Sequence, residues 1–340
     1  MTATTTTAFD SGARTQNPWV KLYILLAIAV GLTLYSIGVG AIRVPVWETV
    51  QTVFGVGTGE FDYIIQQYRM PRIAMAWIVG TGLAVSGTMI QGVIRNPLAS
   101  PEIIGITAGA GLASAVLLLG MPEVSVQFLP FVSFLGGLIA AALVYVLAFK
   151  RGISPARLAL VGIAVSAVFT SGIDYLMTSF PVQLDLALIW LAGSLWARSW
   201  EQCIAIAPWI LIMFVGCLMM AHKLDVLALG DEQATSLGVR VEPTRLLALA
   251  MAVALAGASV AVCGTIGFVG LMAPHMARRL VGGQHHILLP TAALVGTLLV
   301  LTADTLGRII SPPVEVPAGV ITSIVGGPYF IYLLYRHRGW

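Results

Sequence analysis

Long apolar blocks alternate with short polar segments along almost the whole chain. The pattern predicts ten membrane spans, with nine or eleven as the alternatives, at about 20–42, 72–94, 103–119, 128–149, 158–177, 203–221, 245–262, 266–280, 288–306 and 318–335. A helix needs about 20 residues to cross the roughly 30 Å of hydrocarbon in a bilayer. The blocks at 103–119 and 266–280 are shorter, so neighbouring helices must shield them or they must stop short of one interface.

Composition supports the same fold class. The chain is 58% hydrophobic and only 10% charged, which excludes an ordinary soluble domain and predicts an all-α polytopic membrane protein surrounded by lipid. Residues 1–17 are polar and are expected to form a disordered cytoplasmic N-terminus, followed by one transmembrane domain over 18–340. The first apolar block lacks the charged leader and small-residue cleavage site of a signal peptide, so we interpret it as an anchor.

Two further patterns concern the arrangement of the spans. The amphipathic piece Leu184–Trp196 is predicted to lie at the interface, because Trp190 and Trp196 suit the headgroup zone. The run Ala84–Thr88 (AVSGT) recurs as Ala261–Thr265 (AVCGT), five spans later and therefore in the opposite direction. Such an echo is weak evidence by itself, but inverted repeats are typical of transporters.

The distribution of basic residues predicts the orientation. With both termini inside, most of the 18 Lys and Arg residues lie on the cytoplasmic side. The basic residues on the outer side are a minority: Arg43, Arg69, Arg72, Arg198 and Arg308. Acidic residues outnumber these arginines there. The positive-inside rule therefore favours N-in and C-in, with an even number of spans.

The longest polar interruption in the second half of the chain is Leu224–Val241, which this orientation places in the cytoplasm. Gly230 interrupts the run Leu224–Leu229. Asp231 and Glu232 then supply the negative first turn that a helix N-terminus favours. Gly238 stands where a glycine stops a helix. The segment therefore predicts a small helix pair.

A simple turn between two spans does not require such a structured segment. Ala234 and Leu237 are three residues apart and are predicted to share one helix face. We therefore interpret Leu224–Val241 as a docking surface for a cytoplasmic partner.

Two prolines four residues apart enforce an irregular turn at Asn96–Pro101. Asn96 and Leu98, held in that turn, are candidates to close a pathway. The alternative is a rigid loop with no role beyond connection.

Three of the cations predicted on the outer side are candidate site residues. Arg69 and Arg72 stand at the mouth of the second span, and Arg308 follows Asp304 by four residues. These arginines either reach headgroups and pair with Asp304 and Glu315, or form an exposed patch for an acidic partner. The sequence leaves both interpretations open.

Catalytic motifs are absent from the sequence. There is no phosphate loop of the G-x-x-x-x-G-K-[ST] type, no H-E-x-x-H and no G-x-S-x-G. His285-His286 is interpreted as a solvated turn rather than a metal site, and the three cysteines form neither a disulfide framework nor a metal cluster. We expect no enzyme activity, no bound metal or cofactor and no nucleic-acid partner.

Several long motifs give the chain a family resemblance. These are RMPR, the pattern G-x-x-L-A-x-S-G-x-x-x-Q-x-x-x-R-N-P-L-A-x-P-x-x-x-G, LALGDEQATSLGV, GTIGFVGLMAPHMAR, A-D-x-x-x-R and EVPAGVITSIVGGPYF. Over about residues 20–336 the chain closely resembles the FecCD-type permeases, which import iron-siderophores and cobalamin as subunits of ATP-binding-cassette (ABC) importers. The resemblance implies the type II ABC importer permease fold, in the cytoplasmic (inner) membrane of a bacterium.

The resemblance also implies partners. The permease would pair with a second copy or a close paralogue, surrounded by membrane lipid. Two cytoplasmic ATPase subunits would hold the ATP and Mg²⁺, and a siderophore-binding protein would dock outside.

Residue roles follow from the matching motifs. The ATPase would grip the coupling residues Leu229, Gly230, Asp231, Glu232, Ala234, Leu237 and Gly238. Glutamates of the binding protein would pair with Arg69, Arg72 and Arg308. Asn96 and Leu98 would form a cytoplasmic gate. Ser154 matches a second gate position loosely, because Pro155 departs from the polar residue expected there.

The expected cargo is a ferric siderophore, with cobalamin or haem as alternatives. A proton-coupled secondary carrier is the rival from a different class. That mechanism uses acids within the membrane, and Asp174 and Asp304 are both predicted near the outer ends of their spans. A membrane enzyme has the least support.

Overall fold

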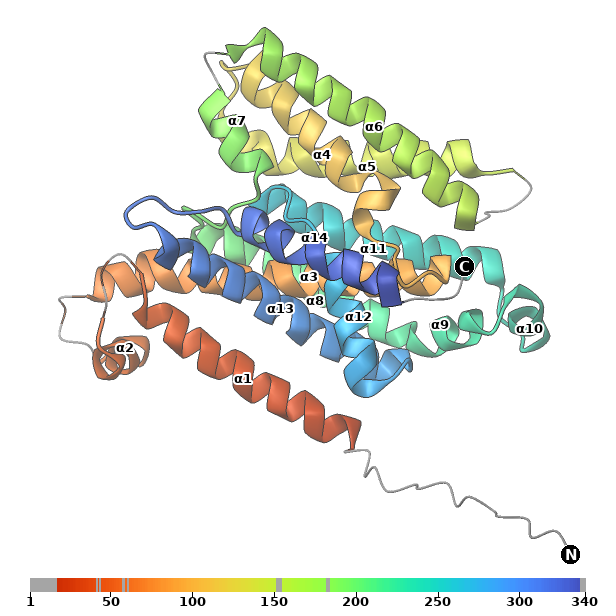
Figure 1. Ribbon diagram of the computed structural model, residues 1–340, viewed down its shortest axis with the longest axis horizontal. Coiled ribbons are helices and arrows are strands. Elements are labelled where there is room, and N and C mark those ends of the chain that lie inside the picture. The colour runs from red at the N-terminus through yellow and green to blue at the C-terminus, as the bar shows by residue number, and fades with distance from the viewer. Residues whose placement is uncertain are drawn as a thin grey trace, which may run out of the picture.

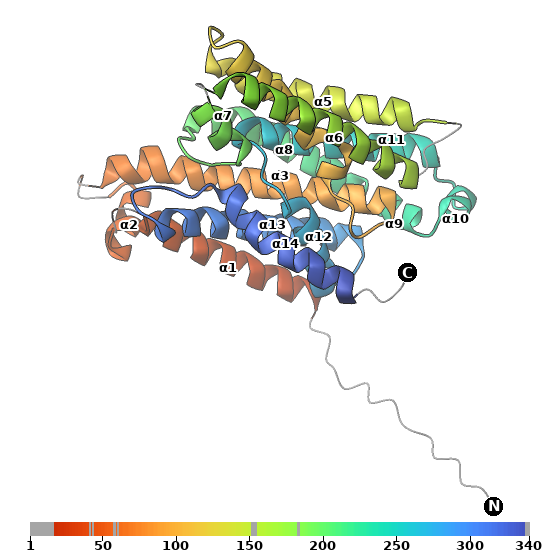
Figure 2. The same cartoon turned by 45° about the horizontal axis from the view of Figure 1, so that its top comes forward.

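The computed structural model describes residues 17–40, 42, 44–56, 59, 61–150, 155–181 and 184–336. Within these ranges the regular elements are all helical, as Figures 1 and 2 show. The prediction of an all-α protein is confirmed. The predicted disorder of residues 1–17 falls almost wholly outside the described ranges.

A helix occupies each of the ten predicted spans. They are α1 (Pro18–Gly38), α3 (Met70–Ile94), α4 (Ile106–Ala115) with the π-helix η3 (Val116–Gly120), α5 (Leu129–Ala148), α6 (Pro155–Ser179), α8 (Trp200–Met219), α11 (Val241–Cys263), α12 (Val269–Val281), α13 (His285–Ile310) and α14 (Ala318–Arg336). Eight helices of the described chain are long and apolar enough to cross a membrane. The other two predicted spans, α4 with η3 and α12, are short, as the sequence predicted.

Shorter helices connect these spans: α2 (Val46–Val53), η1 (Ile64–Arg69), η2 (Pro101–Ile104), η4 (Val126–Phe128), α7 (Leu184–Leu191), α9 (Ala221–Ala228) and α10 (Asp231–Ser236). The prediction of an interfacial helix over Leu184–Trp196 is only partly correct. The helix ends at Leu191, and Trp190 is buried within the protein while Trp196 is 54% exposed. Only Trp196 is therefore available to the headgroup zone.

Helix α3 lies at the centre of the bundle, where it packs against α8, α11, α12 and α13 (Figure 1). In its most apolar stretch 78% of the residues are buried, compared with 17% in the peripheral helix α1. Small residues permit the close packing: a Cβ atom at Gly87 would lie 1.8 Å from the carbonyl oxygen of Gly270 on α12. Because α12 packs between α3, α13 and α14, a helix of 13 residues is shielded on several sides.

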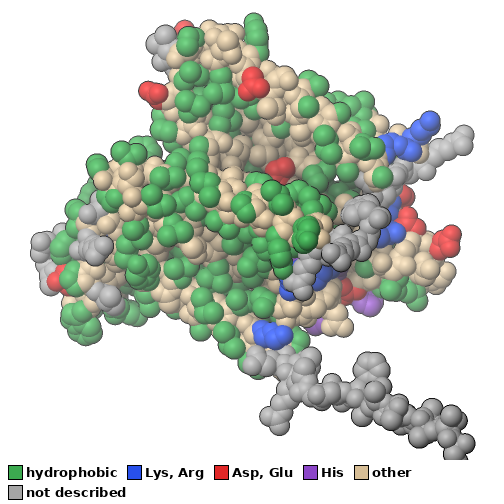
Figure 3. All heavy atoms as spheres, viewed as in Figure 1, with side chains coloured by type: hydrophobic (Ala, Val, Ile, Leu, Met, Phe, Trp, Pro, Cys, Tyr) green, Lys and Arg blue, Asp and Glu red, His purple; other side chains and the backbone are tan. Residues whose placement is uncertain are grey.

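The helices α4 to α7 form a second group beside this centre, and α11 joins the two through contacts with α4 and α5 (Figures 1 and 2). The two helices that carry the sequence echo, α3 and α11, pack directly against each other. Hydrophobic side chains cover most of the middle of the surface in Figure 3. Helix α2 lies at one end of the bundle and α9 and α10 at the other (Figure 1).

Candidate functional site

The predicted helix pair is present at one end of the bundle as α9 and α10. Gly230, with a φ of +113°, separates the two helices, and Asp231 and Glu232 form the first turn of α10. At the other end Gly238 adopts the left-handed region, with a φ of +81°. Its N–H donates to the Thr235 carbonyl, and the next N–H donates to the Ala234 carbonyl, both at 2.9 Å. This pair of bonds is the Schellman motif that ends a helix at glycine.

The exposed tip of this segment is apolar in part. Leu229 is 59% exposed and Leu237 is 62% exposed, while Ala234 is fully buried. The predicted common face of Ala234 and Leu237 is therefore wrong: Ala234 is buried, whereas Leu237 is exposed and is already the C-cap residue of α10. The two leucines can contact a partner, whereas Ala234 anchors α10 to its own protein.

Asp231 does not project freely from this tip. It pairs with Arg95, the residue that follows α3, and with Arg245 in α11, whose Nη2 lies 3.0 Å from Oδ1. Arg245 is 2% exposed and is also paired with Glu242 at 3.2 Å. Burial and the neighbouring Arg245 cation lower the pKa of the Arg95 guanidinium. The carboxylate thus joins α10 to the ends of two central helices.

The predicted gate residues lie beside this ion cluster. Arg95 ends α3 in the left-handed conformation, with a φ of +56°, and Asn96 follows it. The Asn96 side-chain oxygen accepts the N–H of Leu98 at 2.9 Å, and its carbonyl accepts the N–H of Ala99 at 3.0 Å. Asn96 and Leu98 are therefore held in one compact turn. Ser154, the other gate candidate, lies outside the described residues.

The three arginines predicted for the outer surface gather at the opposite end of α3, but they are buried. Arg72 donates to Asp304 at 2.8 Å and to Glu315 at 2.6 Å, and Asp304 also pairs with Arg308 at 3.2 Å. Arg69, Arg72 and Arg308 are 7%, 9% and 5% exposed. The expected exposure of the three arginines is therefore wrong, and the predicted pairing is confirmed for Arg72 with Asp304 and Glu315 and for Arg308 with Asp304. A role of the three in docking a partner stays a prediction.

The remaining donors of these arginines cap α1. Arg69 donates to the Ile37 carbonyl at 2.7 Å, and Arg308 donates to the Val39 carbonyl at 2.6 Å and to Ser36. The last carbonyls of a helix lack partners within the helix and carry partial negative charge, so cations stabilise them. The arginines consequently fix the end of α1 against α3 and α13.

A pocket of about 240 Å³ opens beside this cluster, lined by Arg69, Arg72, Arg308, Glu315, Trp196 and Arg198 among others. Arg198 was predicted on the outer side but not as a candidate site residue. Its guanidinium donates to the carbonyls of Trp196 and Val262, and burial lowers its pKa. The four guanidinium groups outnumber the carboxylates of Asp304 and Glu315, so the cluster carries an excess of positive charge.

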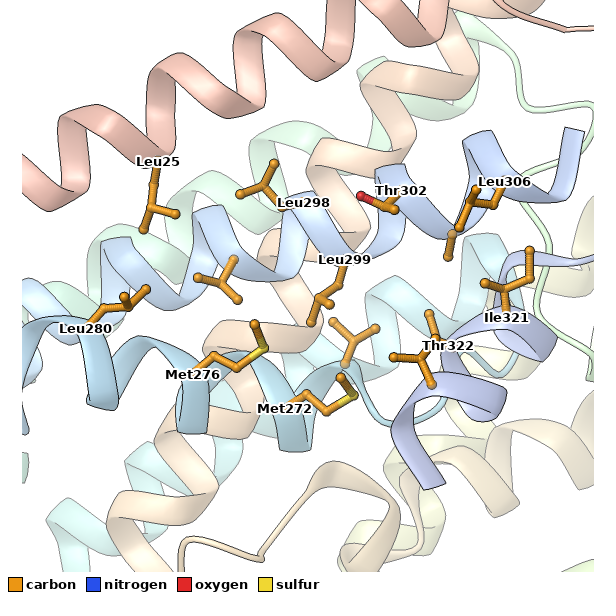
Figure 4. A pocket seen from close by; sticks show the side chains of 14 residues that line it. Leu25, Met272, Met276, Leu280, Leu298, Leu299, Thr302, Leu306, Ile321 and Thr322 are labelled. Carbon is orange, nitrogen blue, oxygen red and sulfur yellow. The ribbon is translucent and has the colours of Figure 1, made fainter. Parts of the chain in front are cut away.

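Two other pockets lie along the helices. One, of about 220 Å³, lies between α1, α12, α13 and α14 and is lined by apolar side chains apart from Thr302 and Thr322, as Figure 4 shows. The other is larger, about 580 Å³, and carries three hydroxyl groups, from Thr107 on α4, Thr265 in the α11–α12 loop and Ser323 on α14. Only the second has the mixed lining that suits a polar solute.

His285 was predicted to lie in a solvated turn, and the structure shows otherwise. His285 is the first residue of α13 and is 2% exposed, with Nδ1 2.6 Å from the Asp225 carboxylate of α9. The Asp225 side chain also accepts the backbone N–H of His285 at 2.9 Å. Among the residues that the structure describes, no three His, Cys, Asp or Glu side chains are grouped to hold a metal ion.

The fold and these sites together define a multi-pass helical membrane protein with an ion-paired cluster at each end of the bundle. The model of the FecCD transport family matches residues 25–336, so the chain belongs to the FecCD transport family. The chain is 49% identical to the Fe(3+)-citrate import system permease protein YfmE of Bacillus subtilis (strain 168), covering 94% of this chain and 96% of the relative.

Two further comparisons agree. The chain is 46% identical to the Fe(3+) dicitrate transport system permease protein FecD of Escherichia coli (strain K12), covering 93% of this chain and 98% of that protein. A solved metal-chelate type ABC transporter in an inward-facing conformation superposes with a TM-score of 0.83 at 33% identity, covering 93% of this chain and 99% of that one. The predicted family and ABC importer permease fold are confirmed, and the chain is a transport component of a bacterial inner membrane.

Proposed function

We propose that this chain is the permease subunit of an ATP-driven importer for a ferric siderophore. The observation that carries the proposal is the α9–α10 segment. It is a capped helix with two exposed leucines, fastened to the ends of α3 and α11, at the opposite end of the bundle from the arginine cluster. A partner that grips the tip can therefore move the central helices.

The partner at this tip is proposed to be a cytoplasmic ATPase, two copies of which bind ATP and Mg²⁺ and serve two permease chains. The permease itself then binds no cofactor. Leu229 and Leu237 supply apolar contact, and Glu232 lies between them on the exposed first turn. Closure of the ATPase dimer displaces α10 and shifts an equilibrium between inward-open and outward-open states. This arrangement requires both termini to lie in the cytoplasm, with the tip.

The partner at the other end is proposed to be an extracytoplasmic siderophore-binding protein. The arginine cluster carries excess positive charge, which favours an acidic surface on that protein. Because Arg69, Arg72 and Arg308 are buried, their side chains do not project from the surface. They attract acidic groups through their electrostatic field and through the open pocket. The side chain of Glu315 is 34% exposed, so a glutamate of the binding protein can reach the Arg72–Glu315 pair.

The cargo is proposed to follow the hydroxyl-lined pocket of about 580 Å³, along α14, between this chain and a second permease copy. Ferric dicitrate is the first chelate to test, because the two relatives compared above carry ferric citrate in their names. The turn at Asn96–Leu98 would close the path at the cytoplasmic side.

Replacing Asp231–Leu237 by a flexible Gly/Ser linker tests the coupling role. Vesicles containing permease, ATPase and binding protein should lose uptake of radioactive ferric citrate while ATP hydrolysis continues. Normal uptake with the linker would refute the role of α10.

Competition identifies the cargo. Unlabelled ferric dicitrate should abolish the uptake of radioactive ferric citrate, whereas haem and cobalamin should leave it unchanged. Inhibition by haem or cobalamin at equal concentration would instead support one of those cargoes.

A further inference from the structure

One carboxylate links the exposed helix α10 to the turn that carries Asn96 and Leu98. Asp231 opens α10 and receives guanidinium groups from Arg95 and Arg245, which are 136 and 14 residues away in the chain. The three residues belong to three different elements: the end of α3, the first turn of α10 and the N-terminal part of α11.

The two arginines that pair with Asp231 differ in burial. Arg245 is fully buried and pairs with Glu242 as well, so it provides a fixed anchor on α11. Arg95 is partly exposed, with 33% of its side chain accessible. A displacement of α10 therefore acts on the less buried of the two, the arginine that ends α3.

Arg95 is connected directly to the turn. Its left-handed backbone, with a φ of +56°, stops α3, and the next residue is Asn96. The bonds from Leu98 and Ala99 back to Asn96 close the turn within four residues. The turn therefore follows Arg95 as one unit, because no flexible segment separates them.

We propose that Arg95 is the positioning residue that transmits movement of α10 to the Asn96–Leu98 turn, through its ion pair with Asp231. This inference rests on the proposed function, in which α10 is the coupling helix and the turn is the gate. It assigns to Asp231 a role inside the permease, whereas the contact with the ATPase belongs to the exposed leucines.

The alternative is that the ion cluster only stabilises the fold. A structural role would lower stability or assembly but would leave the cargo moved per ATP hydrolysed unchanged. The tested variants are Arg95→Gln and Asp231→Asn, singly and combined, together with Arg95→Lys. Arg279→Gln is the matched control, because Arg279 is exposed and lies in the last turn of α12, outside the Leu224–Val241 segment.

The first readout is the number of ferric citrate molecules imported per ATP hydrolysed, in vesicles with the ATPase and the binding protein. Arg95→Gln should lower this ratio by about fivefold or more, the range of coupling between distant sites. Arg95→Lys should retain most of it, because the positive charge remains. The double variant should lower the ratio as much as the more severe single substitution does, because both substitutions break the same ion pair.

The second readout is hydrogen exchange of the 96–104 peptide in the permease alone, which requires no partner. Exchange should become faster in Arg95→Gln and Asp231→Asn and stay unchanged in Arg279→Gln. An unchanged import ratio in Arg95→Gln would overturn the proposal, whatever the exchange shows. So would unchanged exchange, or additive effects in the double variant. Absence of ATP-dependent import by the unaltered protein would instead refute the proposed function, and the exchange comparison would still report on the link.

Discussion

The buried triad Arg72–Asp304–Arg308 predicts a large loss of stability when its acid is neutralised. Asp304 is 1% exposed, and the side chains of its two partners are 10% and 5% exposed. Removing one member of a buried ion pair leaves uncompensated charge and costs about 3–5 kcal/mol. We expect Asp304→Asn to lower the free energy of unfolding by about this amount. Arg72 keeps Glu315 as a partner, which favours the lower end of the range.

The matched control is Glu315→Gln. The Glu315 side chain is 34% exposed, so its pair with Arg72 is screened by solvent and is worth about 1 kcal/mol or less. The assay is equilibrium unfolding of the purified permease in mixed micelles with increasing SDS, followed by the loss of tryptophan signal. Equal effects of the two substitutions, or a smaller effect of Asp304→Asn, would refute the view that the triad is a buried structural unit.

Two further substitutions test packing and coupling. Gly87→Val should prevent α3 and α12 from packing, because even its Cβ atom would lie 1.8 Å from the Gly270 carbonyl oxygen. Gly31→Val on α1 is its control, since nothing lies within 4 Å of the added Cβ. Size-exclusion chromatography should give folded protein only for the second variant, and two folded variants would contradict the close approach. Leu237→Asp should weaken binding of the purified ATPase by about tenfold, roughly 1.4 kcal/mol, without lowering stability, because Leu237 is 62% exposed. Unaltered affinity in a pull-down titration would exclude Leu237 from the contact.

The spans and the helix α10 were predictable because their signals are local. A run of about 20 apolar residues has few stable alternatives to a helix in lipid. The bounds of α10 follow from Gly230 and Gly238, both of which have positive φ angles, and from the acids between them. Neither prediction depends on what the rest of the chain packs against.

The contacts that join the sites were not predictable, because they connect residues far apart in the chain. Arg95 and Asp231 are separated by 136 residues, and no local pattern pairs them. The burial of Arg69 depends on the carbonyls at the end of α1, and that of His285 on Asp225 of α9. In each case the sequence shows a charged or polar residue near a helix end, and only the tertiary packing decides whether it faces solvent.

The most direct test of the whole account compares two energy sources. Vesicles that contain the permease, its ATPase and its binding protein are loaded with or without ATP, and uptake of radioactive ferric citrate is measured with and without a protonophore. The account predicts uptake that requires ATP and both partner proteins and is unaffected by loss of the proton gradient. Uptake by the permease alone that persists without ATP and stops when the proton gradient is abolished would contradict it.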